Sequence, residues 1–116
     1  MLTTTEVEQY ARMTLKQHGF ADHSVVFLPR LTRRLGQANP WEKKIELSPR
    51  CLANFPLFKL VFLHELAHVI QFYRMGRTYK VNGRNAFHNH VFKQACRELN
   101  ISHSTRIELT NYPTRV

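Results

Sequence analysis

The sequence is poor in cysteine, glycine and proline, and these shortages exclude several kinds of protein. Cys51 and Cys96 are the only cysteines in 116 residues, and they form no Cys-x-x-Cys pair. A disulfide scaffold and a four-cysteine zinc ribbon are therefore excluded. Four glycines and five prolines are too few for a collagen-like or low-complexity chain. This length predicts one domain over residues 1–116.

Acidic residues are also scarce, with eight Asp and Glu against 17 Lys and Arg. The difference, 17 − 8, is a net charge of +9, which favours polyanionic partners such as nucleic acid through long-range attraction. The N-terminus is polar and acidic, without a basic stretch leading into an apolar one, so we expect no secretory signal. We expect a protein of the reducing cytoplasm.

Periodicity predicts an α+β chain with about three helices packed on three short strands. The expected helices are about Thr5–His18, Leu57–Arg74 and His88–Asn100, and the expected strands are Ser24–Leu28, Thr32–Ala38 and Lys44–Ser48. Asn39-Pro40 marks a turn between the last two strands, which predicts a hairpin, and we expect the sheet to be antiparallel. From about residue 101 to 116 only Arg106–Leu109 has weak strand character, so we expect a loosely packed C-terminal tail.

The segment Leu57–Arg74 is apolar nearly all round, which predicts a buried central helix, and its polar residues interrupt it too often for a membrane span. It contains His64-Glu65-Leu66-Ala67-His68, the pattern His-Glu-x-x-His, and position 71 continues the same polar stripe. Residues four apart on a helix lie one above the other, so both imidazoles can bind one metal ion. This pattern is typical of zinc peptidases in which the Glu is the general base.

A catalytic zinc ion needs a third protein ligand and an open position. Gln71 and Arg74 stand where the metzincin extension His-x-x-Gly-x-x-His requires Gly and His, so that class is excluded. Glu98 is the only carboxylate between the motif and the tail, and Arg97 beside it indicates a solvent-exposed pair.

His88 and His90 remain as candidates for the third ligand. If the third helix starts near His88, that residue shares the apolar face with Phe92, whereas His90 falls on the polar face. His88 is therefore the predicted ligand. Tyr79, Arg84 and His90 are all candidates for stabilising an oxyanion, and the sequence does not choose among them.

Three blocks of sequence, in this order, resemble the SprT-like (Spartan-type) zinc metalloproteases. The first is Arg34-Leu35-Gly36-Gln37-Ala38 with Trp41 and Ile45-Glu46-Leu47-Ser48, the second is Phe62–His68, and the third is His88-Asn89-His90-Val91-Phe92-Lys93. Asn89 stands where the family usually has Gly, and the C-terminal zinc ribbon of many bacterial members has no counterpart here. The resemblance implies a minimal zincin-like fold, one zinc ion on His64, His68 and His88, and Glu65 as the catalytic base.

The resemblance also implies cleavage of proteins that are associated with DNA or crosslinked to it, stimulated by single-stranded DNA. Two basic clusters, on the hairpin and on the loop after the central helix, suit such a partner. The candidate nucleic-acid contacts are Arg33, Arg34, Lys43, Lys44, Arg77, Lys80 and Arg84. Tyr79 lies among them, and cations interleaved with an aromatic ring fit a groove for single-stranded nucleic acid. We expect a cytoplasmic, nucleoid-associated enzyme with a protein substrate and no membrane partner.

Two other functions stay open. One is a regulatory peptidase with the same motif, a dedicated protein target and no dependence on DNA. The other is a non-enzymatic DNA-binding module in which the zinc is structural. The presence of Glu65 is evidence against the non-enzymatic module, because a structural zinc site needs no base. A Glu65→Gln variant should keep the metal and lose cleavage only where the site is catalytic.

Overall fold

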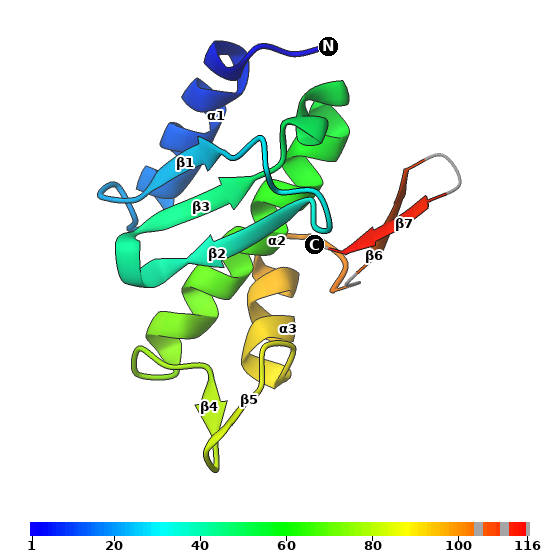
Figure 1. Cartoon of the computed structure of the whole chain (residues 1–116). Helices are drawn as coiled ribbons and strands as arrows, with labels where there is room; N and C mark the ends of the chain where they lie inside the picture. The colour runs from blue at the N-terminus through cyan, green and yellow to red at the C-terminus, as the bar shows by residue number, and fades with distance from the viewer. Residues whose placement is uncertain (104–105, 110–111, 116) are drawn as a thin grey trace.

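The computed structural model describes residues 1–103, 106–109 and 112–115, with side chains described up to residue 103. These residues form an α+β fold in which helices pack behind a small sheet, drawn in Figure 1. The helices are α1 (Thr4–Gln17), α2 (Phe55–Arg74) and α3 (His90–Glu98), and the sheet strands are β1 (Ser24–Phe27), β2 (Gly36–Asn39) and β3 (Lys44–Leu47). The sequence-based assignment of these elements is confirmed, with ends that differ by a few residues.

The three-stranded sheet is mixed rather than antiparallel. Its order is β1-β3-β2, with β3 antiparallel to β2 and parallel to β1. The predicted hairpin between β2 and β3 is present, closed by the short 3-10 helix η1 (Pro40–Glu42) and by Lys43 in a left-handed conformation with φ 57°. The parallel pair arises because the chain crosses from β1 to the far edge before it forms this hairpin, so that β3 returns between the two strands.

Helix α2 is the centre of the molecule. Asn54 caps its N-terminus, where its side chain accepts a hydrogen bond from the Leu57 amide at 2.9 Å. The helix packs against α1, α3, β2 and β3, and in Figure 1 it runs behind the sheet. Phe58, Phe62 and Leu66 are fully buried along it. Burial of each such side chain contributes about 1.5–3 kcal/mol, so the predicted central helix is also the main source of core stability.

By length and composition alone, α2 also qualifies as a helix that could cross a membrane. However, 78% of its most apolar 18-residue window is buried inside the fold. The core helix of a compact domain passes the same test, so this result is weak evidence for a membrane segment.

The remaining elements are short. A 3-10 helix, η2 (Pro49–Ala53), leads into α2, and a two-residue-strand hairpin, β4 (Lys80–Val81) with β5 (Arg84–Asn85), separates α2 from α3. Strand β6 (Arg106–Leu109), which the sequence predicted weakly, pairs antiparallel with β7 (Tyr112–Arg115). The prediction of a loosely packed tail over residues 101–116 falls partly on residues 104–105, 110–111 and 116, outside the described part of the chain.

Candidate metal centre

Three histidines that are far apart in the sequence come together beside α2. One ligand atom from each of His64, His68 and His88 lies within 4.8 Å of the other two. His64 and His68 are buried one helical turn apart on α2, and His88 is exposed. Nitrogen ligands sit about 2.0–2.1 Å from zinc, so two ligands of one ion are separated by up to about 4 Å. A small side-chain adjustment therefore lets this cluster hold a metal ion.

Phe92 forms a common support for the three imidazole rings. Its side chain is fully buried on α3 and stacks on His68 with ring centroids 4.2 Å apart. The rings of His64 and His88 each meet the Phe92 ring edge to face at 5.0 Å. Because Phe92 contacts all three rings, the packing of α3 on α2 determines where the histidines stand relative to one another.

Glu65 directly follows His64 on α2 and is buried. The side chain is 2% exposed, and its Oε2 atom is buried without a hydrogen-bond partner. Burial raises the pKa of Glu65 to about 8, and the positive charge of Arg34 acts in the opposite direction. A buried carboxyl group with an unsatisfied oxygen is costly unless a cation or a polar ligand compensates it. This side chain therefore fits a centre that holds a cation and its bound water.

His88 reaches the centre by a different route from the one predicted. Helix α3 begins at His90, so His88 lies outside it and shares no helical face with Phe92. The reason is the cap: the Asn89 side chain accepts hydrogen bonds from the amides of Val91 and Phe92 at 3.1 and 3.2 Å. His90 is exposed, as expected.

Glu98 takes no part in the histidine cluster, in agreement with the sequence argument, but its partner is not Arg97. Arg74 at the end of α2 forms a two-pronged pair with it, with Nη2 to Oε1 at 2.8 Å and Nη1 to Oε2. This pair lowers the pKa of Glu98. The ion pair joins the C-terminal ends of α2 and α3.

The sequence analysis placed Gln71 on the polar stripe of the helix and used it to exclude metzincins, but it missed a hydrogen-bond network behind His68. His68 Nδ1 lies 2.9 Å from Gln71 Oε1. Gln71 Nε2 donates to the carbonyl of Ala86 at 2.9 Å and to Asn89 Oδ1 at 3.1 Å. The signal in the sequence was the position of this residue on the polar stripe of an otherwise apolar helix.

Tyr79 is buried rather than exposed to a ligand. Its hydroxyl donates to the backbone carbonyl of His68 at 2.9 Å, and burial raises the pKa of Tyr79. This hydroxyl is therefore engaged in supporting α2, and the ring is not available for stacking. The exposed aromatic side chains nearby are Trp41, 67% exposed, and Phe87, 43% exposed, and both rings contact Tyr79.

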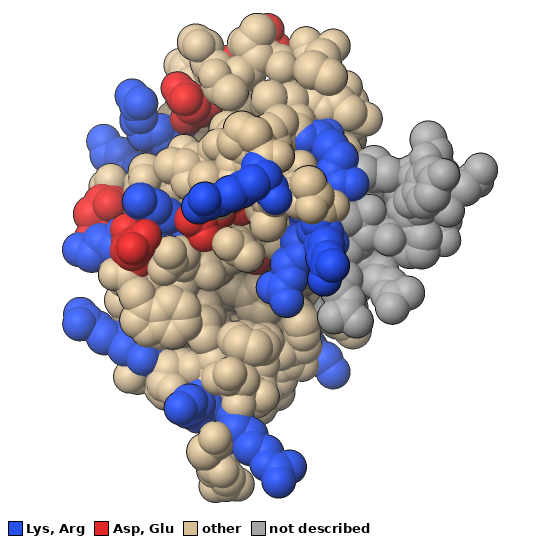
Figure 2. Space-filling view, in the orientation of Figure 1, with Lys and Arg blue, Asp and Glu red and all other residues tan. Residues whose placement is uncertain are grey.

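The seven predicted nucleic-acid contacts differ in their surroundings. Lys43 pairs with Asp22 at 2.7 Å and Lys44 with Glu42 at 3.6 Å. Figure 2 shows acidic side chains among the basic ones at the end of the sheet where β2 and β3 are connected. Among the residues with described side chains, no ion pair involves the other five, which are all exposed: Arg33, Arg34, Arg77, Lys80 and Arg84.

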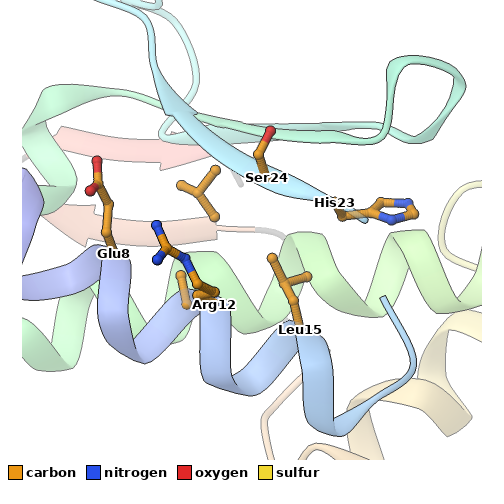
Figure 3. A pocket seen from close by; sticks show the side chains of 7 residues that line it. Glu8, Arg12, Leu15, His23 and Ser24 are labelled. Carbon is orange, nitrogen blue, oxygen red and sulfur yellow. The ribbon is translucent and has the colours of Figure 1, made fainter. Parts of the chain in front are cut away.

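A hollow lies between α1 and β1 (Figure 3). Its volume is about 200 Å³, and its lining consists of Glu8, Ala11, Arg12, Leu15, His23, Ser24 and Val25. The His23 ring is engaged with Asp22 at 2.8 Å and with the Tyr73 hydroxyl at 3.5 Å. None of the lining residues belongs to the histidine centre.

Fold and site together define a small α+β protein with a His-Glu-x-x-His helix and a third histidine that can hold a metal ion with it. The model of the SprT-like family matches residues 4–113, and the chain belongs to this family. Comparisons with curated proteins and with solved structures found no match. The SprT-like family is generally associated with metallopeptidase-like proteins, and the histidine cluster is compatible with that class.

Proposed function

We propose that this chain is a zinc-dependent endopeptidase, with one zinc ion held by His64, His68 and His88. The supporting observation is the convergence of three imidazoles, two of them on the same helix as the buried carboxyl group of Glu65. Three nitrogen ligands suit zinc in its tetrahedral geometry and leave the fourth position for water or substrate. His88 is the exposed member of the set, so the side of the centre that it borders is the entrance.

Zinc held by His64, His68 and His88 would polarise the scissile carbonyl and lower the pKa of a bound water. In this reaction Glu65 would accept a proton from the attacking water as the water oxygen bonds to the carbonyl carbon. The same carboxyl group then delivers the proton to the leaving nitrogen as the carbon–nitrogen bond breaks. Burial of Glu65 favours this role, because a carboxylate in a desolvated position holds a proton more readily than one in water.

We further propose that the substrates are proteins associated with DNA or crosslinked to it, and that single-stranded DNA stimulates cleavage. The net charge of +9 supports this, together with the five exposed cations that form no ion pair among the described side chains. Arg34 lies close enough to the centre to act on the pKa of Glu65, His68 and His88. Trp41 and Phe87, rather than Tyr79, supply exposed rings on which bases can stack.

The proposal is tested by incubating the zinc-loaded chain with a basic DNA-binding protein, with and without single-stranded DNA, beside a Glu65→Gln variant. We expect cleavage that requires both DNA and Glu65. Removal of the base is expected to reduce the rate by about 10²–10⁴-fold while zinc content stays the same. Cleavage that requires Glu65 and ignores DNA would favour the regulatory peptidase with a dedicated target. Zinc binding without cleavage of any tested protein would contradict the enzymatic proposal.

A fluorescence-anisotropy titration tests DNA binding separately from cleavage. Binding should weaken steeply with salt, because each neutralised phosphate releases counterions. Replacing Lys80 and Arg84 by Gln should lower the slope of log affinity against log salt, whereas Lys43→Gln should change it less, since Lys43 already pairs with Asp22. Absence of binding at low salt would exclude DNA as a partner.

A further inference from the structure

The inference concerns Gln71, which lies on α2 one turn beyond the His-Glu-x-x-His motif and is completely buried. We propose that Gln71 is a positioning residue that keeps His68 in the tautomer needed for metal binding and joins it to the segment that carries His88. This inference rests on the proposed zinc site.

The orientation of the Gln71 amide follows from the groups around its nitrogen. Nε2 faces two acceptors, the Ala86 carbonyl at 2.9 Å and Asn89 Oδ1 at 3.1 Å. Asn89 Oδ1 must itself be an acceptor, because it caps α3 through the amides of Val91 and Phe92. A flipped Gln71 would place an oxygen against two oxygens in a buried position, which leaves acceptors without donors. Both protons of the Gln71 amide are therefore used.

The orientation of Gln71 in turn determines the tautomer of His68. Gln71 Oε1 can only accept a hydrogen bond, and it lies 2.9 Å from His68 Nδ1. The proton of a neutral His68 ring must then be on Nδ1, which leaves the lone pair on Nε2 for a metal ion. Outer hydrogen bonds of this kind orient ligand imidazoles in metal sites and raise their basicity.

The same amide connects the two segments that supply the ligands. His68 is on α2, and Asn89 directly follows His88 in the sequence. Asn89 is also the N-cap of α3, and its Nδ2 donates to Met75 Sδ at 3.3 Å. The path from His68 through Gln71 to Asn89 therefore holds the start of α3 against α2. Phe92 contacts all three rings one turn later, so the two contacts place His88 beside His68.

Two variants separate these roles. Gln71→Leu removes both the acceptor for His68 and the link to Asn89. Gln71→Glu retains an oxygen for His68 but sets a second oxygen against the Ala86 carbonyl and Asn89 Oδ1. Thr14→Val on α1 is the matched control, because it removes a partly buried side-chain hydrogen bond, 2.8 Å to the Tyr10 carbonyl, that has no connection to the centre.

Zinc affinity is measured by competition with a chromophoric chelator, and the His68 tautomer by ¹H–¹⁵N NMR of the metal-free protein. We expect Gln71→Leu to lose about 10–100-fold in zinc affinity. In the wild type the His68 proton should be on Nδ1, and in Gln71→Leu this preference should be lost. Gln71→Glu should keep the Nδ1 tautomer and bind zinc more weakly than the wild type. Thr14→Val should leave affinity and tautomer unchanged.

A His68 proton on Nε2 in the wild type would overturn the inference, as would a Gln71→Leu variant with wild-type zinc affinity. Both results would leave the proposed peptidase untouched, because cleavage by the wild type is measured separately. Failure of the wild type to bind zinc would overturn the inference and the proposed function together. Should Gln71→Leu fail to fold, the wild-type tautomer and the affinity of Gln71→Glu still decide the question.

Discussion

Replacing Gly36 by alanine tests how closely the sheet approaches the helix that carries the motif. Gly36 begins β2, and its backbone lies directly against α2. A Cβ atom at this position would lie 2.8 Å from Leu47 Cδ2, 3.0 Å from Val61 Cγ1 and 3.2 Å from Glu65 Cγ. The φ angle of Gly36 is outside the left-handed region, so the cost of the substitution is steric rather than conformational.

The magnitude follows from these distances. Carbon atoms pack at about 3.5–4.0 Å, so the new methyl group would be roughly 0.7 Å too close to Leu47 alone. Leu47 and Val61 are fully buried, and Val61 is β-branched, so neither side chain can turn away freely. Overpacking of this kind costs about 1–3 kcal/mol. The same methyl group would lie 3.2 Å from Glu65 Cγ, so fitting it in would also shift the Glu65 side chain on α2.

The assay is urea unfolding of Gly36→Ala, followed by the cleavage assay on the folded variant. Gly19→Ala is the control, since Gly19 has φ +86° and no atom within 4 Å of its added Cβ. Its expected loss of about 1–2 kcal/mol comes from backbone strain at the end of α1. Both variants should lose stability, and only Gly36→Ala should also cleave more slowly. An unfolding free energy of Gly36→Ala within about 0.5 kcal/mol of the wild type would refute the close approach.

Three further predictions concern metal, acid and the aromatic surface. Zinc at one hundred times its dissociation constant should stabilise the fold by about 2.7 kcal/mol. A chelator should therefore lower the Tm of the zinc-loaded protein, and this shift should be absent in His68→Ala. The hydrogen bond from Lys43 lowers the pKa of Asp22 to about 2, well below the ordinary value of an aspartate. The contribution of the Asp22–Lys43 pair to the free energy of unfolding is thus present above about pH 4 and lost as the pH falls toward 2. Asp22→Asn should flatten the acid limb of the stability curve, and an unchanged limb would contradict the pairing. Trp41→Ala should weaken binding of single-stranded DNA about 5–150-fold, the equivalent of stacking one base, and Trp41→Phe should restore part of it. Equal affinity for all three proteins in an anisotropy titration would exclude Trp41 as a stacking surface.

Local sequence patterns were sufficient to predict the helices, the strands of the sheet and the two histidines of the motif. The four-residue spacing of His64 and His68 places both rings on one side of any helix that contains them, whatever surrounds it. The apolar composition of Phe55–Arg74 likewise requires burial. The strands were recognised from alternation and from the turn at Asn39-Pro40. These inferences succeed because they depend only on neighbours within about one turn of helix or one strand.

The third histidine was predicted correctly to lie with the other two, although one of the reasons given for it was wrong. The prediction placed His88 on the apolar face of the third helix together with Phe92. That helix starts after His88, at His90, because Asn89 caps it. The resemblance to the family pointed to His88 independently of that argument. The N-cap of a helix depends on neighbouring residues, but several polar residues in this part of the sequence could cap α3. Only the packing of α3 on α2 decides that Asn89 is the cap.

The sequence by itself determined the central helix, its His-Glu-x-x-His motif and the excess of positive charge, since each is a property of residue type and short-range spacing. The tertiary structure decided the parallel pairing of β1 with β3, the burial of Tyr79 and the ion pairs of Lys43 and Lys44. It also decided the connection of His68 through Gln71 to Asn89. Apart from the pair of Lys44 with Glu42, which are two residues apart, these features join segments that local periodicity does not relate to one another. They depend on the path of the backbone, which is determined by the packing of the whole core around α2.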